Sequence, residues 1–185
     1  AVICGADRNI KENDIAHTTG ELISVNINKS ILGSVINPLG VNMATLKKIE
    51  GEGVSKIPVE QRSPGIIVRQ PIFEPLLTGL TIVDSLVPIG RGQRELIIGD
   101  RQTGKTSITI DTILNQTTVV CVYVSIGQKS SGVAQIFTTL SKVNKVKNLV
   151  IVCASDSDAA PLQYLAPYSV CSVAECFRDN YVDAI

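Results

Sequence analysis

An eight-residue run near the middle of the chain has the residue types of a phosphate-binding loop. Residues 99–106 read Gly-Asp-Arg-Gln-Thr-Gly-Lys-Thr and match the pattern G-x-x-x-x-G-K-[ST] at every fixed position. Gly104 would let the backbone approach a phosphate, and the amide groups of the loop would form an anion cradle at a helix N-terminus. Lys105 is expected to reach the β- and γ-phosphates, and the Thr106 hydroxyl to bind Mg²⁺. The run predicts nucleotide binding; the alternative is a strand–helix turn with an incidental lysine.

Hydrolysis would need two further groups, a carboxylate near the Mg²⁺ and a group that activates water. Asp156 is the candidate for the first role, but it stands three residues beyond the expected strand end, and we favour helix capping for it and for Asp158. Gln128 follows another expected strand, at the position that would face the phosphates. Its amide cannot accept a proton, so the sequence favours binding without turnover. The alternative for Gln128 is a solvated loop residue.

The elements around this loop alternate between apolar strands and amphipathic helices. The second of the helices is predicted from Val133, Ile136, Phe137 and Leu140, which keep the i, i+3, i+4, i+7 spacing of a half-buried helix. The expected order is strand 95–98, helix 105–115, strand 119–124, this helix, strand 149–153 and a helix that begins in 161–168. This order predicts an α/β fold with a parallel sheet covered on both faces by helices.

The first third of the chain has a different pattern. Residues 1–26 show turn signals and brief alternation, with a strand expected over 21–26, and residues 39–64 are polar and indicate an irregular connector. Because so little strand cannot close a sheet, we expect residues 1–26 to pair with chain outside these 185 residues or with another protein.

The composition limits the classes of protein that fit. The chain has 185 residues, 17 basic and 17 acidic, which give zero net charge and argue against a nucleic-acid binder with a broad basic surface. No apolar run approaches the roughly 18 residues of a membrane-spanning helix. Only 18% of residues are charged, so we expect the protein to bury faces against partners or to be part of a longer chain.

Five cysteines stand at 4, 121, 153, 171 and 176, without a C-x-x-C pair. Cys121 and Cys153 lie in apolar strands, where a free cysteine behaves as a small hydrophobic residue. The pattern argues against a disulfide framework or a zinc site and favours a reducing compartment.

Three segments together resemble the alpha subunits of F-type ATP synthases. They are residues 83–98 running directly into the loop 99–106, the run Ser-Ile-Gly-Gln-Lys at 125–129, and residues 158–168. The resemblance implies a RecA-like P-loop domain that binds ATP or ADP with Mg²⁺ but leaves catalysis to neighbouring beta subunits. In that family a glutamine matches Gln128, where beta subunits have their catalytic glutamate.

The resemblance also implies a set of site residues, and none of them is catalytic. The nucleotide contacts carried over by position are Gln102, Thr103, Gly104, Lys105, Thr106, Ser107, Arg101 and Gln128, with Thr106 also on the metal. Residues 1–26 would be the C-terminal part of a β-barrel domain, and residues 27–185 the first part of an incomplete nucleotide-binding domain.

The expected partners are beta subunits on both sides, the central-stalk gamma subunit, the peripheral stalk and the remainder of the alpha subunit. They form a complex that synthesises ATP and transports hydrogen ions. Residues 171–180 resemble mitochondrial forms, which implies the matrix face of the inner membrane. The short stretch 115–118 is similar to bacterial and chloroplast relatives, so a bacterial plasma membrane or a thylakoid is the alternative.

Two other functions remain open. A catalytic RecA-like ATPase of the secretion or flagellar type would need a glutamate in place of Gln128. A purely structural subunit would keep the loop without binding nucleotide, and nucleotide occupancy would distinguish it.

Overall fold

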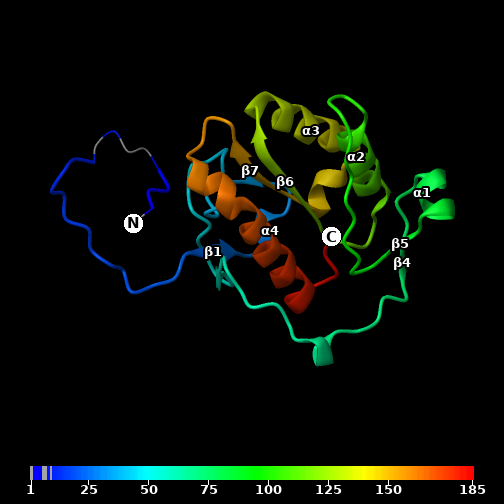
Figure 1. The fold of residues 1–185 in the computed structure, drawn as a ribbon, viewed down its shortest axis with the longest axis horizontal. Coiled ribbons are helices and arrows are strands. Elements are labelled where there is room, and N and C mark those ends of the chain that lie inside the picture. Colours follow the sequence, from blue (N-terminus) through cyan, green and yellow to red (C-terminus); the bar gives the residue numbers. More distant parts are fainter. Residues whose placement is uncertain (1, 6–7, 9) are drawn as a thin grey trace. The chain divides into compact units, whose positions relative to one another are not determined.

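The chain forms two compact units in a computed structural model that describes residues 2–5, 8 and 10–185. The first unit contains the described residues up to Gln61 together with Val120–Ile185, and the second is Arg62–Val119 (Figure 1). The elements of the first unit are β1 (Ser24–Ile27), η1 (Lys29–Ile31), β2 (Val35–Ile36), β3 (Ser55–Pro58), β6 (Cys121–Gln128), α3 (Ser130–Lys142), η3 (Lys145–Asn148), β7 (Leu149–Ser155) and α4 (Ala160–Asn180). Those of the second are η2 (Ile66–Val68), β4 (Pro75–Leu76), α1 (Thr81–Leu86), β5 (Ile89–Gly90) and α2 (Lys105–Asn115).

A three-stranded parallel sheet in the order β2-β7-β6 forms the centre of the first unit. All seven residues of β7 are buried, as a central strand covered on both faces requires. Helices α3 and α4 both pack against β6 and β7. The predicted α/β fold with a parallel sheet and flanking helices is therefore confirmed, and β6 and β7 extend four and two residues beyond the predicted strand ends.

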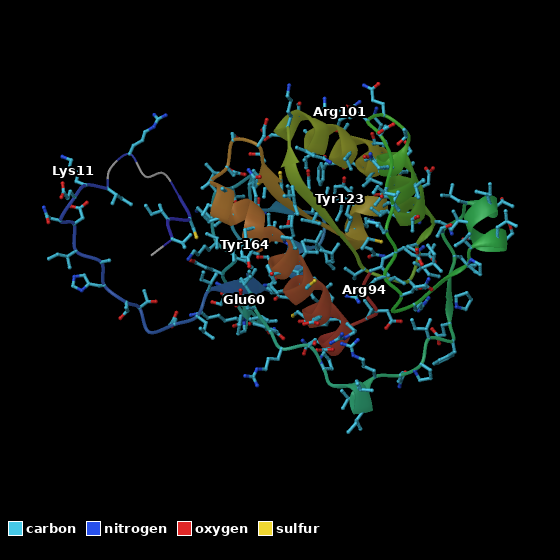
Figure 2. All side chains as sticks on the ribbon, viewed as in Figure 1. Lys11, Glu60, Arg94, Arg101, Tyr123 and Tyr164 are labelled. Carbon is cyan, nitrogen blue, oxygen red and sulfur yellow. The ribbon has the colours of Figure 1, made fainter. Side chains whose placement is uncertain are left out.

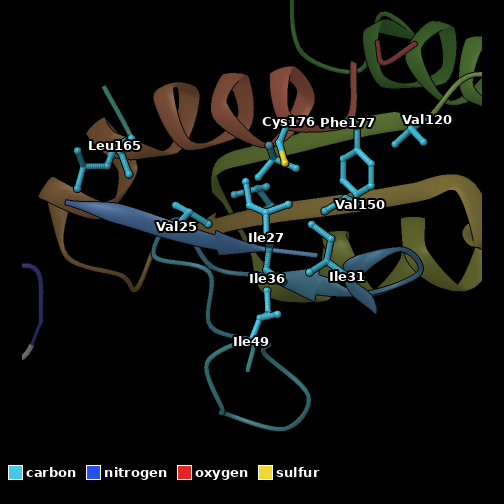
Figure 3. Close-up of a cluster of buried hydrophobic side chains, with 13 residues drawn as sticks. Val25, Ile27, Ile31, Ile36, Ile49, Val120, Val150, Leu165, Cys176 and Phe177 are labelled. Carbon is cyan, nitrogen blue, oxygen red and sulfur yellow. The ribbon is translucent and has the colours of Figure 1, made fainter. Parts of the chain in front are cut away.

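The apolar faces of α3 and α4 follow from their sequences. Val133, Ile136 and Leu140 of α3 are buried, at the predicted spacing. In α4, Leu165, Cys176 and Phe177 join a core with residues from β1, β2 and β7 (Figure 3). Cys121 and Cys153 are buried in their strands, as predicted. None of the helices in the described residues combines the length and the apolar character that crossing a membrane requires.

The N-terminal third corrects two expectations from the sequence. The segment 39–64, predicted as an irregular connector, contains β3, which pairs antiparallel with β1. The strand predicted to need a partner from elsewhere thus finds one inside the same unit, because Val25 and Ile27 of β1 can bury their side chains under α4. Residues 1, 6, 7 and 9 of the predicted barrel segment lie outside the described residues; the division at residue 26 stays a prediction.

The strand predicted at 95–98 is wrong, because these residues have no regular structure and Leu96 is 81% exposed. An apolar run becomes a strand only when another strand edge accepts its hydrogen bonds. On the edge of β6 away from β7, the amides of Val120 and Val122 already donate to the carbonyls of Asp183 and Ile185. Terminal residues of the first unit thus occupy part of that edge.

Candidate nucleotide-binding loop

The run 99–106, predicted to bind phosphate, adopts a conformation that its glycine permits. Gly104 has φ 91°, in the left-handed region, and α2 begins at the next residue, as predicted. Gln102 also has a positive φ of 61°. Alternation of right- and left-handed backbone turns successive amide groups toward one side, which is the geometry of an anion-binding nest. The loop therefore presents N–H groups and the positive end of an eleven-residue helix to the same place.

The ammonium group of Lys105 lies back across the loop. Its Nζ donates to the carbonyl oxygen of Asp100 at 2.7 Å and also to that of Gly99. Lysine has three N–H donors, so two hold the side chain against the loop and one is left for an anion. The loop is braced a second time by Thr103, whose hydroxyl donates to the Asp100 carbonyl at 2.9 Å.

The other residues of the loop that are predicted to contact the nucleotide are exposed. Thr106 and Ser107 stand exposed in the first turn of α2, and Arg101 projects from the loop into solvent (Figure 2). The structure thus gathers residues 101–107 into one accessible loop and helix start. A hydroxyl at Thr106 suits Mg²⁺, which is usually held by one or two protein oxygens with phosphate oxygens and water completing its shell.

Gln128 belongs to the other unit, where it ends β6 and is exposed. The hydroxyl of Ser125 donates to its Oε1 at 3.1 Å. Sequence reasoning did not single out Ser125. Ser125 is a lone serine inside an otherwise apolar strand, and this could have indicated a hydrogen bond to a nearby polar side chain, since a buried hydroxyl needs a partner.

The helix-capping role predicted for Asp156 and Asp158 is wrong. Ala159 is the N-cap of α4, and no side chain caps that helix end. The Asp158 carboxylate instead accepts from the amide and the hydroxyl of Ser155, at 2.7 and 2.9 Å. It closes the turn that follows β7, since both donors belong to the last residue of that strand. The alternative role of Asp156 at a metal stays a prediction.

Comparison with known proteins identifies the family of the chain. Residues 79–185 match the family model of the ATP synthase alpha/beta family, nucleotide-binding domain. The whole chain is 49% identical, over 187 aligned positions, to ATP synthase subunit alpha of Dichelobacter nodosus (strain VCS1703A). The chain spans 36% of the length of that relative. The resemblance to alpha subunits drawn from the motifs is confirmed, and the chain belongs to the ATP synthase alpha/beta family.

Proposed function

We propose that this chain is a non-catalytic, regulatory nucleotide-binding part of an ATP synthase alpha subunit, which holds Mg-ATP or Mg-ADP without turning it over. The observation that carries the proposal is the loop itself, with Gly104 in the left-handed conformation directly before Lys105 at the start of α2. This conformation favours phosphate binding before any ligand arrives, so little ordering free energy is spent on the loop.

The identity of Gln128 supports the non-catalytic part of the proposal. A general base must accept a proton from the attacking water, and a carboxamide cannot do so near neutral pH. A catalytic ATPase of the secretion or flagellar type would need a base at this position, and this chain has a glutamine there instead. The Mg²⁺, when bound, would supply charge neutralisation between the phosphate oxygens; Thr106 is the residue that would hold it.

The same family membership supports a proposal about partners. We propose beta subunits on both sides, the gamma subunit, the peripheral stalk and the remainder of the alpha subunit, in a complex that couples hydrogen-ion transport to ATP synthesis. Twelve large apolar residues of the second unit are exposed, which suits a chain that is covered by neighbours. They are Ile66, Ile67, Val68, Ile72, Phe73, Leu77, Ile82, Leu86, Val87, Leu96, Ile97 and Ile98.

The membrane on which such a complex sits remains part of the proposal. The relative named above is bacterial, which favours the bacterial plasma membrane over the matrix face of the mitochondrial inner membrane. In either case we propose a peripheral position.

Calorimetry with Mg-ATP and Mg-ADP tests the proposal directly. We expect saturable binding by the chain, a loss of at least about 100-fold in affinity for Lys105→Ala, and no phosphate release above background. Arg94→Ala serves as the matched control, since it removes an exposed positive charge outside the loop. Binding by Lys105→Ala equal to that of the wild type would remove the loop from the site, and no binding at all by the wild type would favour a structural subunit. Turnover by the wild type would favour the catalytic ATPase.

A further inference from the structure

The end of β6 contains an irregularity that changes which side chains share a face. Ile126 pairs with Ala154, and Gln128 pairs with Ser155, so Gly127 is an extra residue in the ladder. Gly127 has φ 65°, a conformation that glycine adopts without strain. In a regular strand, residues three apart point to opposite faces. The bulge resets the alternation and brings Ser125 and Gln128 to the same side.

The hydroxyl of Ser125 sets the orientation of the amide that it meets. Ser125 is 1% exposed, and a buried hydroxyl is costly unless it finds an acceptor. The Oε1 of Gln128 provides that acceptor at 3.1 Å, although Gln128 itself is exposed. Because only the oxygen end of the amide can accept this bond, the NH₂ end is the one directed away from the strand.

The neighbouring polar groups have partners of their own. The Ser155 hydroxyl and the Asp158 carboxylate bond to each other. Gln163 donates from Nε2 to the carbonyl of Ser155 at 3.1 Å. The main-chain oxygen of Gln128 accepts from the amide of Asp156 at 3.3 Å, which holds the backbone of the bulge. The orientation of the Gln128 amide thus depends on Ser125.

We propose that Ser125 is a positioning residue that fixes the Gln128 amide with its NH₂ group outward, so that this position offers a hydrogen-bond donor to an anionic oxygen. This inference rests on the proposed function and on Gln128 being one of the nucleotide contacts that the family resemblance implies. A flipped amide would present an oxygen lone pair to the same phosphate and repel it. The serine therefore makes the position selective for an anionic oxygen.

The first experiment measures the pKa of the carboxyl group introduced by Gln128→Glu, by NMR titration of the full chain without nucleotide. A hydroxyl that donates to a carboxylate lowers its pKa. We expect Ser125→Ala, combined with Gln128→Glu, to raise this pKa by about one unit. Ser125→Cys, which keeps a weak donor and nearly the same volume, should raise it by less. The nearby carboxyls of Asp156 and Asp158 are present in every variant, so their effect cancels.

Ser172→Ala is the matched control, because Ser172 is also 1% exposed and donates to backbone carbonyls, those of Pro58 and Val59. Its loss should lower stability as much as the loss of Ser125 and leave the titration unchanged. An unchanged titration in both Ser125 variants would overturn the proposal. So would an equal change in the Ser172 variant, because the effect would then follow stability alone.

The second experiment measures Mg-ATP affinity with Gln128 in place. We expect Ser125→Ala to weaken binding by about three- to tenfold and Ser172→Ala to leave it unchanged. A shifted titration with unchanged affinity would overturn the role of Ser125 toward the ligand. If the wild-type chain binds no Mg-ATP, the proposed function fails. The NMR titration would still show whether Ser125 orients the side chain at residue 128.

Discussion

The two units of the chain differ in how much apolar surface they bury. The first unit contains nearly all of the buried apolar residues, including residues 149–154 of β7. Within Arg62–Val119, Ile113 and Val119 are the buried apolar residues, whereas Ile67 is 99% exposed. Yet this second unit carries the predicted phosphate-binding loop. The sheet unit therefore has an apolar core of its own, whereas the loop unit buries little apolar surface.

The largest expected effect comes from the core of the first unit. Phe177→Ala removes a ring that is 1% exposed and should cost about 3–5 kcal/mol in the free energy of unfolding, measured by urea titration of the chain. Leu96→Ala in the second unit should change it by less than about 0.5 kcal/mol, because Leu96 is already exposed. Equal costs for the two variants would contradict the contrast between the units.

The second largest effect should be a loss of stability of the first unit at alkaline pH. Burial raises the pKa of the Cys121 thiol from its ordinary 9.0 to about 11. As pH rises, this thiol ionises in the unfolded chain before it ionises in the folded one. The contribution of the neutral, buried thiol to the free energy of unfolding is therefore complete below pH 9 and is lost as pH rises to about 11. The wild type should lose about 3 kcal/mol more than Cys121→Ala over this range in urea titrations. Parallel curves for the two proteins would show that the thiol is not shielded from water.

Mg-ATP should stabilise the second unit selectively. A ligand at 100 times its Kd stabilises the state that binds it by about 2.7 kcal/mol. Hydrogen exchange should therefore slow in the loop and in α2, where Ile108 donates to the Gly104 carbonyl at 3.1 Å, and change little in β7. Lys105→Ala is the control, and it should abolish the protection. Equal protection of β7 would mean that the nucleotide acts on both units alike.

The smallest effect should come from a cluster of hydrogen bonds inside the second unit, between Asp84 and residues 78 and 79; we call it the Asp84 joint. The Asp84 carboxylate accepts from the hydroxyl and amide of Thr78, at 2.6 and 2.9 Å, and from the amide of Gly79 at 3.0 Å. These bonds hold the pKa of Asp84 below its ordinary 3.8, with the Thr78 hydroxyl contributing most. The stabilisation is therefore present above pH 3.8 and lost as pH falls through the lowered pKa.

Asp84→Asn tests this joint, because one end of the amide cannot accept a hydrogen bond. We expect faster hydrogen exchange at Thr78 and Gly79 at neutral pH, with β7 unchanged. At a pH well below the lowered pKa, the variant and the wild type should exchange alike at these two amides. A difference that persists there would mean that the carboxylate charge is not what holds the joint.

Several features could be predicted from the sequence because they depend on local order along the chain. The 3.6-residue period predicted α2 at its observed bounds and the buried face of α3, since a helix closes its hydrogen bonds within one segment. The loop motif likewise fixes its own geometry, because Gly104 and the following helix start are adjacent in sequence. The family could also be predicted from three short segments, and the comparisons confirm it.

Other features were decided only by the tertiary structure, because they depend on pairing between distant residues. Residues 95–98 have the composition of a strand but no ladder partner among the described residues, whereas the unremarkable run Ser55–Pro58 became β3 because β1 offered an edge. The bulge at Gly127 is equally a property of the pairing of β6 with β7. It alone brings the hydroxyl of Ser125 to the amide of Gln128, a contact that strand periodicity would place on opposite faces.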